Sequence, residues 1–436
     1  MSEETKKAMA AAERAAVKVP KLAVPKLTPP ASRPTSALTG SVARSLAPKQ
    51  DEQAKQVMVV EDDWGKDEAG QPVKLDIAYK FAFIGTGQGG GNLAASFWRL
   101  GYRRVGIINT SDTDFGDIEK EMPDLPKLSF KIGGAAKDME LARTQFMARS
   151  EEVWDLLVRA WGSDPEYIFV CAGLGGGTGS GTVVPLINLA RKYMEARGKP
   201  PKVGVLVSFP QIDEGQKICR NAVQGFREIL EAKASPVLII DNARINTVYK
   251  PGLLKLYGKA NEVVSGLLHV FNNLAATRST LTSFDQAELA QLLDGGVCML
   301  ASADIDAPHS PADISTAIRE KLANSVLAAC DLRRGRKAGC LFVADEETLN
   351  RLPSDYFAAG FTQLDRILGS GYTDRDKNPP VVHRGVYVGS EPGIQCYVMI
   401  SELEPPIIRM SEMAKVAGLD VKGVTSALAQ YLGIQD

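Results

Sequence analysis

Short apolar runs and segments of helical period alternate along the middle of the chain. The apolar runs have the length and composition of buried parallel strands, and we place them at residues 77–84, 105–110, 167–171, 202–210 and 236–242. Segments with apolar residues at helical spacing lie at residues 93–100, 139–161, 183–196 and 217–232. This alternation predicts an α/β fold with a doubly wound parallel sheet, in which ligands bind beyond the carboxyl ends of the strands.

A second pattern begins after residue 255. One long helix is predicted over residues 256–276, and strands mixed with helices follow it. We expect strands at 295–301, 338–344, 381–388 and 394–401, helices at 311–332 and 354–368, and one or two short helices within 410–430. The fold class is therefore a parallel-sheet domain, a long central helix and a smaller α+β C-terminal domain.

The first 56 residues differ in composition from the rest. They contain two Val-Pro-Lys-Leu units, at 19–22 and 24–27, followed by a stretch rich in Pro, Ser and Thr. Residues 1–50 hold nine Lys or Arg against three Glu, a net charge of +6, and no aromatic residue. Such a segment buries too little apolar surface to offset its ordering entropy, so we predict a disordered basic arm. A solvated spacer and an arm that contacts nucleic acid, a membrane or a neighbouring subunit both stay open.

Composition argues against a membrane-spanning protein, a secreted protein and a zinc protein. The 436 residues carry a net charge of −1, with 44% apolar and 24% charged residues, as in an ordinary soluble globular protein. No apolar run reaches the roughly 20 residues that cross a bilayer, and no secretory signal opens the chain. Six scattered cysteines suit reduced thiols in a cytoplasmic protein, and three histidines without ligand spacing argue against a zinc site.

One glycine-rich loop carries the strongest chemical signal. Residues 172–182 read Ala-Gly-Leu-Gly-Gly-Gly-Thr-Gly-Ser-Gly-Thr, between the strand at 167–171 and the helix at 183–196. Such a loop presents backbone N–H groups and the positive end of a helix dipole to an anion. Glycine lets the backbone approach phosphate oxygens because it has no Cβ atom, and Thr178 and Ser180 add hydroxyl donors. We predict a phosphate site here, with a flexible surface turn as the alternative.

A second strand–loop–helix unit contains residues 85–92, which read Gly-Thr-Gly-Gln-Gly-Gly-Gly-Asn. It lacks the Gly-x-Gly-x-x-Gly ending and acidic residue of a dinucleotide fold, and the loop at 172–182 lacks the Lys-Ser/Thr of a Walker motif. The order Gly-Gly-Gly-Thr-Gly-Ser-Gly at 175–181 instead resembles the signature loop of the tubulin/FtsZ family of GTP-driven filament proteins. The resemblance covers roughly residues 77–403 and implies a divergent prokaryotic, plasmid or phage relative.

The resemblance implies which loops contact the nucleotide. It gives this role to the signature loop, to the loop at 85–92, to a Gly-Ala-rich loop at 132–138 over the γ-phosphate, to Glu214 and to an asparagine at the ribose or base edge. The implied residues of these segments are Gly87, Gln88, Gly89, Gly90, Asn92, Gly134, Ala135, Gly175, Gly176, Gly177, Thr178, Gly179, Ser180, Glu214 and Asn242.

Charged positions around these loops leave alternatives open. Lys137 either meets a phosphate or is a lone surface lysine. Ser111 interrupts the family's Asn-Thr-Asp pattern, so metal and helix-cap roles both stand for Asp112 and Asp114, and no metal ligand is assigned. Ile218 occupies the position of the family's basic residue, so that contact is lost or moved to Lys217 or Arg220.

The resemblance also implies that the helix at 256–276 begins at the guanine base. Tyr257, Asn261 and Glu262 match the family's aromatic-Gly-x-x-Asn-acid pattern. Stacking of Tyr257 on the purine would contribute roughly 1–3 kcal/mol, Asn261 would bind the base edge, and Glu262 would accept from guanine N1–H and the 2-amino group. Adenine offers no such pair of donors, so an acid here favours GTP. An ordinary helix start is the alternative.

Two acids follow this helix. Asp285 and Glu288 match the acids of the family's Asn-x-Asp-x-x-Asp loop, with Ser283 at the position of the Asn. The resemblance implies that this loop enters the nucleotide pocket of the next subunit. Two carboxylates over one helix turn can orient a water in line with the γ-phosphorus, because phosphoryl transfer needs mainly positioning and charge stabilisation. The same sequence is also a plain helix cap, so catalytic and structural interpretations both stand.

These inferences give an expected organisation and function. We expect a disordered basic arm at 1–56, a GTP-binding domain at 57–254, a central helix and acidic catalytic loop at 255–294, a mixed-sheet domain at 295–405 and a helical tail at 406–436. The expected function is a cytoplasmic GTPase that binds GTP or GDP with Mg²⁺ and assembles head to tail into filaments for positioning, segregation or division. Its arm would contact an adaptor, a membrane or nucleic acid. A nucleotide-binding scaffold or regulator with little GTPase activity is the alternative.

Overall fold

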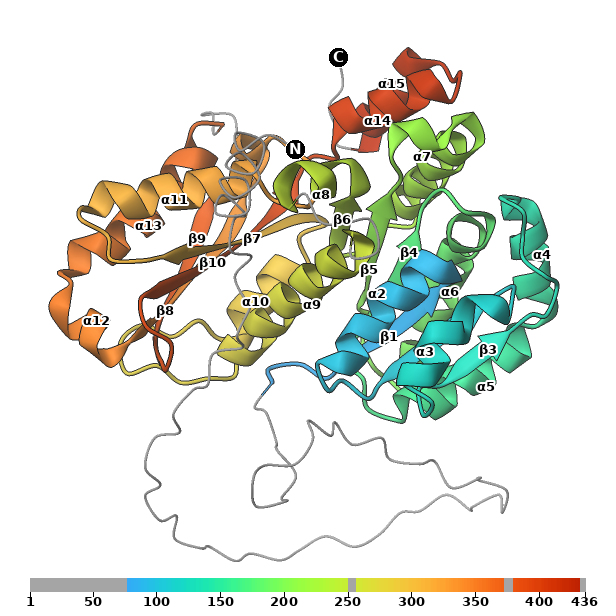
Figure 1. Ribbon diagram of the computed structural model, residues 1–436, viewed down its shortest axis with the longest axis horizontal. Coiled ribbons are helices and arrows are strands. Elements are labelled where there is room, and N and C mark those ends of the chain that lie inside the picture. The colour runs from blue at the N-terminus through green and yellow to red at the C-terminus, as the bar shows by residue number, and fades with distance from the viewer. Residues whose placement is uncertain (1–76, 250–255, 372–378, 432–436) are drawn as a thin grey trace, which may run out of the picture.

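The computed structural model describes residues 77–249, 256–371 and 379–431 (Figure 1). The basic arm expected at 1–56 lies outside the described residues. The fold class expected from the sequence is confirmed, because the described chain forms a mixed α/β structure around a large and mostly parallel sheet. Within the described residues, no helix is long and apolar enough to cross a membrane.

One ten-stranded sheet runs through the molecule in the order β3-β2-β1-β4-β5-β6-β7-β10-β8-β9. The strands from β3 to β7 pair in parallel, β10 is antiparallel to both β7 and β8, and β9 is parallel to β8. The strands are β1 (Phe81–Thr86), β2 (Val105–Asn109), β3 (Lys127–Ser129), β4 (Tyr167–Gly173), β5 (Val203–Phe209), β6 (Val237–Asp241), β7 (Val297–Ile305), β8 (Lys337–Asp345), β9 (Val381–Gly389) and β10 (Ile394–Leu403).

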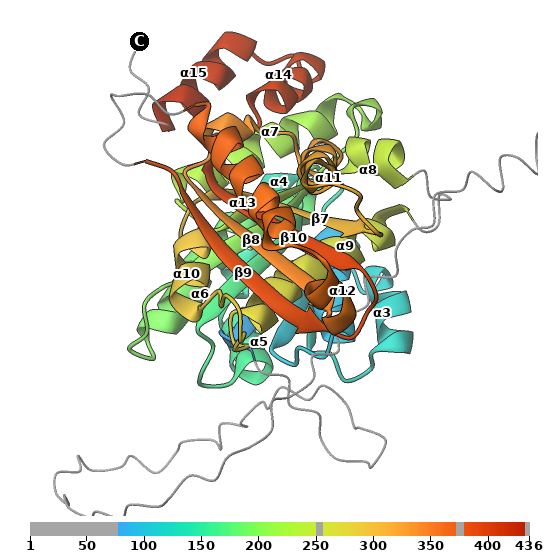
Figure 2. The ribbon, with the colours of Figure 1, turned by 90° about the vertical axis from the view of Figure 1, so that its left-hand side faces the viewer.

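Helices cover the sheet, and β1 and β6 are buried at every residue. Figures 1 and 2 show α9 and α10 between the part of the molecule built on strands β1 to β6 and the part built on β7 to β10. The helices are α2 (Gly87–Arg99), α3 (Gly116–Glu121), α4 (Met139–Ala148), α5 (Ser150–Trp161), α6 (Gly177–Glu195), α7 (Gln216–Glu231), α8 (Asn242–Tyr249), α9 (Leu256–Leu274), α10 (Gln286–Leu293), α11 (Pro311–Ala323), α12 (Glu346–Arg351), α13 (Ser354–Gly369), α14 (Ile407–Val416) and α15 (Val421–Tyr431).

Two helices predicted from periodicity differ from those observed. The segment 139–161 is two helices rather than one, because Arg149 leaves the helical conformation (φ −120°, ψ 25°) and α4 packs on α6 while α5 packs on β2. The helix predicted over 311–332 ends at Ala323. Residues 326–328 instead extend along the end of β6, where the Asp241 N–H donates to the Val326 carbonyl at 2.9 Å.

The two halves of the sheet meet at a short seam. β6 and β7 pair at only two positions, Val237 with Val297 and Leu238 with Cys298. The C-terminal strands β7 to β10 continue the same sheet as the parallel strands before them.

A histidine lies in the packing between α9 and the parallel half. His269 is 1% exposed, and its Nδ1 lies 3.2 Å from the hydroxyl of Tyr102. Burial lowers the pKa of His269 to about 4, because the low-dielectric interior disfavours its charged form. The folded protein therefore holds this imidazole neutral at pH values where the unfolded chain takes up a proton.

This burial predicts a pH dependence of stability. Between the unfolded pKa near 6.5 and the folded pKa near 4, only the unfolded chain binds the proton, so the free energy of unfolding falls as the pH falls through this window. The full loss should be about 3 kcal/mol. Urea unfolding of the wild type and of His269→Gln at pH 7, 6, 5 and 4 measures it. The wild type should lose more stability than the variant, and parallel curves would contradict the assignment.

Candidate functional site

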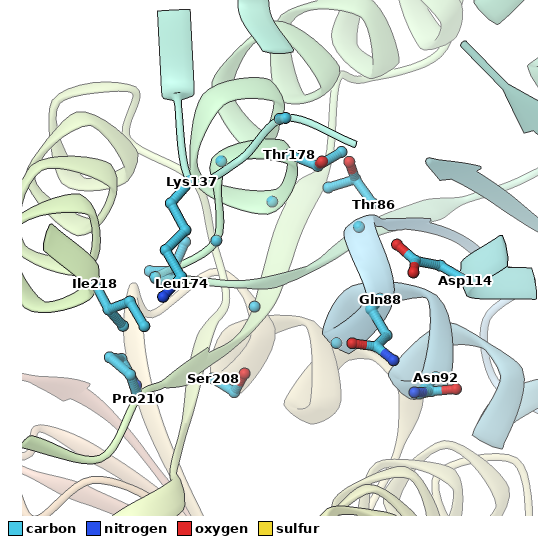
Figure 3. A pocket seen from close by; sticks show the side chains of 18 of the residues that line it. Thr86, Gln88, Asn92, Asp114, Lys137, Leu174, Thr178, Ser208, Pro210 and Ile218 are labelled. Carbon is cyan, nitrogen blue, oxygen red and sulfur yellow. The ribbon is translucent and has the colours of Figure 1, made fainter. Parts of the chain in front are cut away.

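A pocket of about 580 Å³ lies at the carboxyl edge of the parallel strands, where the loops after β1, β2, β4, β5 and β6 meet the start of α9 (Figure 3). It is lined by Thr86, Gly87, Gln88, Gly89, Asn92, Asn109, Thr110, Asp114, Gly134, Ala135, Ala136, Lys137, Gly173, Leu174, Gly175, Gly176, Gly177, Thr178, Gly179, Ser208, Pro210, Glu214, Ile218, Asn242, Ile245, Tyr257 and Asn261.

Two helix N-termini face this pocket. α2 begins at Gly87 directly after β1, and α6 begins at Gly177 after the loop that follows β4. The first N–H groups of a helix have no partner within the helix, and the helix dipole places partial positive charge there. Two such ends in one cavity form a site for an anion, and phosphate is the anion that proteins commonly bind in this way.

Glycine is required where the loops pack together. A Cβ atom at Gly179 would clash with the carbonyl oxygen of Gly173, because the first turn of α6 packs directly on the end of β4. Gly175 has a φ of +147°, and a Cβ atom there would lie 2.8 Å from Cγ2 of Ile218. The glycines thus serve two purposes: they permit backbone contact between loops, and they leave the backbone open to a ligand.

Hydrogen bonds fix the loops relative to one another. Thr86 and Thr182 share a hydrogen bond between their hydroxyl groups at 2.6 Å, which joins β1 to α6. Thr110 and Thr178 share another at 2.8 Å, which joins the end of β2 to the start of α6. All four side chains are buried, so these bonds hold the pocket in one arrangement.

Most predicted nucleotide-binding residues line this one pocket. They come from six separate segments of the chain: Gly87, Gln88, Gly89, Asn92, Gly134, Ala135, Gly175, Gly176, Gly177, Thr178, Gly179, Glu214, Asn242, Tyr257 and Asn261. The geometry brings them together, and their contacts with a nucleotide remain a proposal.

Three predicted residues lie outside the pocket wall. Gly90 faces β4, where a Cβ atom would clash with the carbonyl oxygen of Cys171. Ser180 is fully buried, and its hydroxyl accepts a hydrogen bond from the Gly175 N–H at 2.9 Å, so it shapes the loop from behind. Glu262 has a 59% exposed side chain that lies 3.3 Å from the Lys259 ammonium, on the outside of α9.

The pocket wall also contains residues that motif reasoning missed. Thr86, Asn109 and Ser208 stand at the carboxyl ends of β1, β2 and β5, so the general rule for ligand sites in parallel sheets could have found them. Asp114 lines the wall and Asp112 does not, and the Asp114 carboxylate accepts from the Asn109 amide at 2.9 Å. Among the described residues, no group of three or more His, Cys, Asp or Glu side chains could hold a metal by itself.

The two cations near Ile218 on α7, Lys217 and Arg220, have different partners. Ile218 lines the pocket and packs on Gly175. The Lys217 ammonium donates to the Ala136 carbonyl at 3.3 Å, and the Arg220 guanidinium donates to the Ala417 carbonyl at 3.0 Å, so Arg220 binds the C-terminal helices. Among the described residues of the pocket wall, Lys137 is the one cation.

The acidic pair lies at the opposite edge of the sheet. Asp285 is the N-cap of α10: its Oδ1 accepts from the Glu288 N–H at 2.9 Å, and Glu288 Oε2 accepts from the Asp285 N–H at 3.0 Å. The next residue, Gln286, bonds to Ala78 and Tyr79 just before β1 begins, whereas the pocket lies where β1 ends. The acids therefore do not reach the pocket of their own chain.

A buried histidine holds one of these acids. His383 on β9 is 8% exposed, and its Nδ1 lies 3.0 Å from Glu288 Oε1. Both carboxylate oxygens of Glu288 thus have partners, while Asp285 is exposed and uses only Oδ1 in the cap. Among the described residues, no hydrogen bond is recorded for the second oxygen of Asp285, Oδ2.

Glycine loops and two helix N-termini at the carboxyl edge of a parallel sheet are the arrangement with which α/β proteins commonly bind phosphate groups. Residues 80–250 match the family model described as Tubulin/FtsZ family, GTPase domain, which confirms the resemblance to the tubulin/FtsZ family. Tubulin-like protein TubZ of Bacillus cereus is 24% identical over 363 residues, 76% of this chain and 81% of that protein. Cell division protein FtsZ of Porphyromonas gingivalis is 26% identical over 300 residues, 67% of this chain and 60% of that protein.

Solved structures agree on the fold. The GTPγS-form protofilament of Bacillus thuringiensis serovar israelensis TubZ superposes with a TM-score of 0.65 at 18% identity, over 82% of this chain and 95% of that one. CetZ2 of Haloferax volcanii, in a GTPγS-bound protofilament, gives a TM-score of 0.62 at 20% identity, over 79% of this chain and 98% of that one. The described chain therefore has the tubulin/FtsZ fold.

The close packing at Gly179 predicts the effect of one methyl group. Gly179→Ala should lower the free energy of unfolding by about 1–3 kcal/mol, because the added Cβ overpacks the contact with Gly173. Gly176→Ala is the matched control in the same loop, since its Cβ would meet no atom within 4 Å and its φ is −72°. Thermal unfolding of both variants measures the difference. Equal losses would show that the close approach is not what requires glycine at 179.

Proposed function

We propose that this protein is a GTPase that assembles head to tail, with the nucleotide held by one subunit and hydrolysis completed by the acidic loop of the next. The observation that carries the proposal is the separation of the two sets of residues. The glycine-lined pocket lies at the carboxyl edge of β1, and Asp285 and Glu288 lie beyond its amino edge. The protofilament structures named above, of TubZ and CetZ2, support a head-to-tail arrangement.

The pocket suits a nucleoside triphosphate. Its phosphates would lie between the N-termini of α2 and α6, where backbone N–H groups have no partner within the helix. The base would lie on Tyr257, which is 46% exposed at the start of α9, with Asn261 one turn further along the same helix. Asn242, in the same wall, would then contact the ribose or the base edge. Asn261 becomes the main candidate to distinguish guanine, because Glu262 points outward.

The oxygen donors of the pocket wall fit Mg²⁺ bound together with the phosphates. Mg²⁺ sites in nucleotide pockets commonly use one or two carboxylates and complete the shell with phosphate oxygens and water. Asp114 is an acid of the pocket wall beside the start of α2, and Thr110 and Thr178 add hydroxyl groups nearby. When bound, the ion would neutralise phosphate charge, while the chain's own part is to hold the triphosphate against two helix ends.

The acidic turn at Asp285 would supply the group that orients the attacking water. The free oxygen of Asp285 would accept a proton from a water and orient it towards the terminal phosphate of the neighbouring subunit. Glu288 would keep the turn in place, because its two oxygens bind the Asp285 N–H and His383. Hydrolysis then requires contact between subunits, so the rate per subunit should rise once filaments form.

A nucleotide-binding scaffold with little GTPase activity is the second candidate. Its support is that Asp285 and Glu288 form a complete capping box, which already explains both acids, and that Ile218 stands where the family has a basic residue. A scaffold would bind GTP and release phosphate slowly at every protein concentration.

The substitution Asp285→Asn separates catalysis from capping. Asparagine is as good an N-cap as aspartate, so a purely structural role predicts no change. A catalytic role predicts that phosphate release above the assembly threshold falls at least about 100-fold while GTP binding is kept. Asp345→Asn, at the N-cap of α12, gives an upper bound for the cost of this exchange at a cap, because Asp345 Oδ2 also accepts from the Gly393 N–H at 2.9 Å. Undiminished phosphate release in Asp285→Asn, or a wild-type rate independent of protein concentration, would contradict the split site.

The stacking role of Tyr257 gives a second test. Tyr257→Ala should weaken GTP binding by about 1–3 kcal/mol, which is roughly a 5- to 150-fold increase in Kd. Tyr257→Phe keeps the ring and should bind GTP like the wild type. Calorimetric titration with GTP and GDP measures both variants, and the loss should be similar for the two nucleotides because they share the base. Wild-type affinity in Tyr257→Ala would remove this residue from the base site.

A further inference from the structure

The segment that carries the two acids is fastened to β9, a strand at one end of the sheet (Figure 2). The Val386 N–H donates to the Thr282 carbonyl at 2.9 Å, and the Tyr387 hydroxyl accepts from the Phe284 N–H at 2.8 Å. His383 lies four residues before Tyr387, so the two side chains share one face of the strand, and both are buried. The strand β9 therefore determines where the acidic turn at Asp285 lies.

The contact of His383 with Glu288 depends on one ring nitrogen. His383 Nδ1 lies 3.0 Å from Glu288 Oε1. An ionised carboxylate only accepts hydrogen bonds, so Nδ1 is the donor. The other nitrogen, Nε2, is buried and has no hydrogen-bond partner among the described residues, and a proton there would leave an N–H group buried and unpaired. We therefore assign a neutral ring with its proton on Nδ1.

Close packing holds the imidazole ring in place. The ring of His383 meets the ring of Phe284 edge to face, with the centroids 6.3 Å apart. A Cβ atom at Gly385, between His383 and Tyr387, would lie 3.2 Å from the Cβ atom of Phe284, so the acidic turn packs directly on the strand. The imidazole consequently has little room to rotate and present its other nitrogen to Glu288.

A chain of hydrogen bonds connects this buried ring to the exposed acid. Glu288 Oε1 faces His383, and Glu288 Oε2 accepts from the Asp285 N–H at 3.0 Å. The capping box by itself uses one oxygen of Glu288, whose side chain is 28% exposed. His383 binds the second oxygen and so fixes the orientation of the carboxylate. The position of Asp285 depends on that carboxylate in turn, because it binds the Asp285 backbone.

We propose that His383 is a positioning residue for hydrolysis: by donating from Nδ1 to Glu288, it holds Asp285 where this acid meets the attacking water in the neighbouring subunit. The inference rests on the proposed function, since it requires that Asp285 acts on the nucleotide of the next subunit. His383 does not line the nucleotide pocket and acts only through Glu288. A misplacement of about 1 Å in a reacting geometry can lower a rate about 100-fold, so a bond that only orients the turn affects turnover.

Phosphate release per assembled subunit tests the inference, in the full-length protein with GTP and Mg²⁺ and with assembly measured by sedimentation. His383→Leu removes the donor and keeps a side chain of similar size, so it should lower this rate about tenfold or more. His383→Asn places an amide N–H at the position of Nδ1 and should keep most of the wild-type rate. Both variants should keep the wild-type Kd for GTP, because His383 lies outside the pocket wall.

Thermal unfolding of the same variants separates positioning from folding. His383→Asn buries an amide oxygen where histidine has a C–H group, so it should be at least as destabilised as His383→Leu. The turnover rates should follow the opposite order. His269→Leu is the matched control, because it makes the same exchange at another buried histidine, whose Nδ1 faces Tyr102 instead of an acid of the turn. It should lower the unfolding temperature and leave the rate per assembled subunit unchanged.

The possible failures are distinguishable. A wild-type rate in His383→Leu, or a rate in His383→Asn as low as in His383→Leu, would overturn the positioning role and leave the split site itself intact. Rates that follow the unfolding temperatures of all three variants would overturn it as well, since a loss of stability would then explain them. A wild-type protein whose phosphate release does not depend on assembly would overturn the proposed function, and the inference with it.

Discussion

The site depends on backbone contact between two strand–loop–helix units. Gly90 of α2 packs on the carbonyl of Cys171 in β4, and Gly179 of α6 packs on the carbonyl of Gly173, at distances that no Cβ atom would permit. These contacts draw the first turns of α2 and α6 to the same edge of the sheet. The partial positive charges of two helices then act on one cavity, where a single helix end would be weaker. The positive electrostatic potential of the pocket thus depends on these glycines.

The same sheet sets the distance between the two ends of the molecule. The pocket is built on the parallel strands, whereas the acidic turn is fixed by β9: the Tyr387 hydroxyl accepts from the Phe284 N–H at 2.8 Å, and Thr282 pairs with Val386. α9 begins at the pocket and ends before the acidic turn, so it connects the two. β6 and β7 share only two residue pairs, and α9, which packs on both α2 and β7, adds contact between the two parts of the sheet.

Much of this arrangement was predictable from the sequence. The differences between prediction and structure, at three predicted pocket residues and in one helix, share a physical reason. Strand–glycine–helix units are local patterns, so the loops around Gly87 and Gly177 and their meeting at one edge followed from spacing and topology. Which side of a helix a residue faces is set by tertiary packing: Gly90 turns to β4, Ser180 turns back to its own loop, and Glu262 turns to solvent. The break at Arg149 likewise comes from two packing partners, which periodicity alone does not contain.

The C-terminal helix α14 belongs to the support of the pocket. Arg409 is 6% exposed; it donates to the Pro210 carbonyl at 2.7 Å and lies 3.0 Å from Asp241. Burial raises the pKa of Asp241, and Arg409 opposes that shift. Pro210 lines the pocket, as does Asn242, which follows Asp241. Removing one member of a buried ion pair commonly costs about 3–5 kcal/mol. The two segments of the pocket wall at Pro210 and Asn242 therefore depend on an arginine far along the chain to hold them.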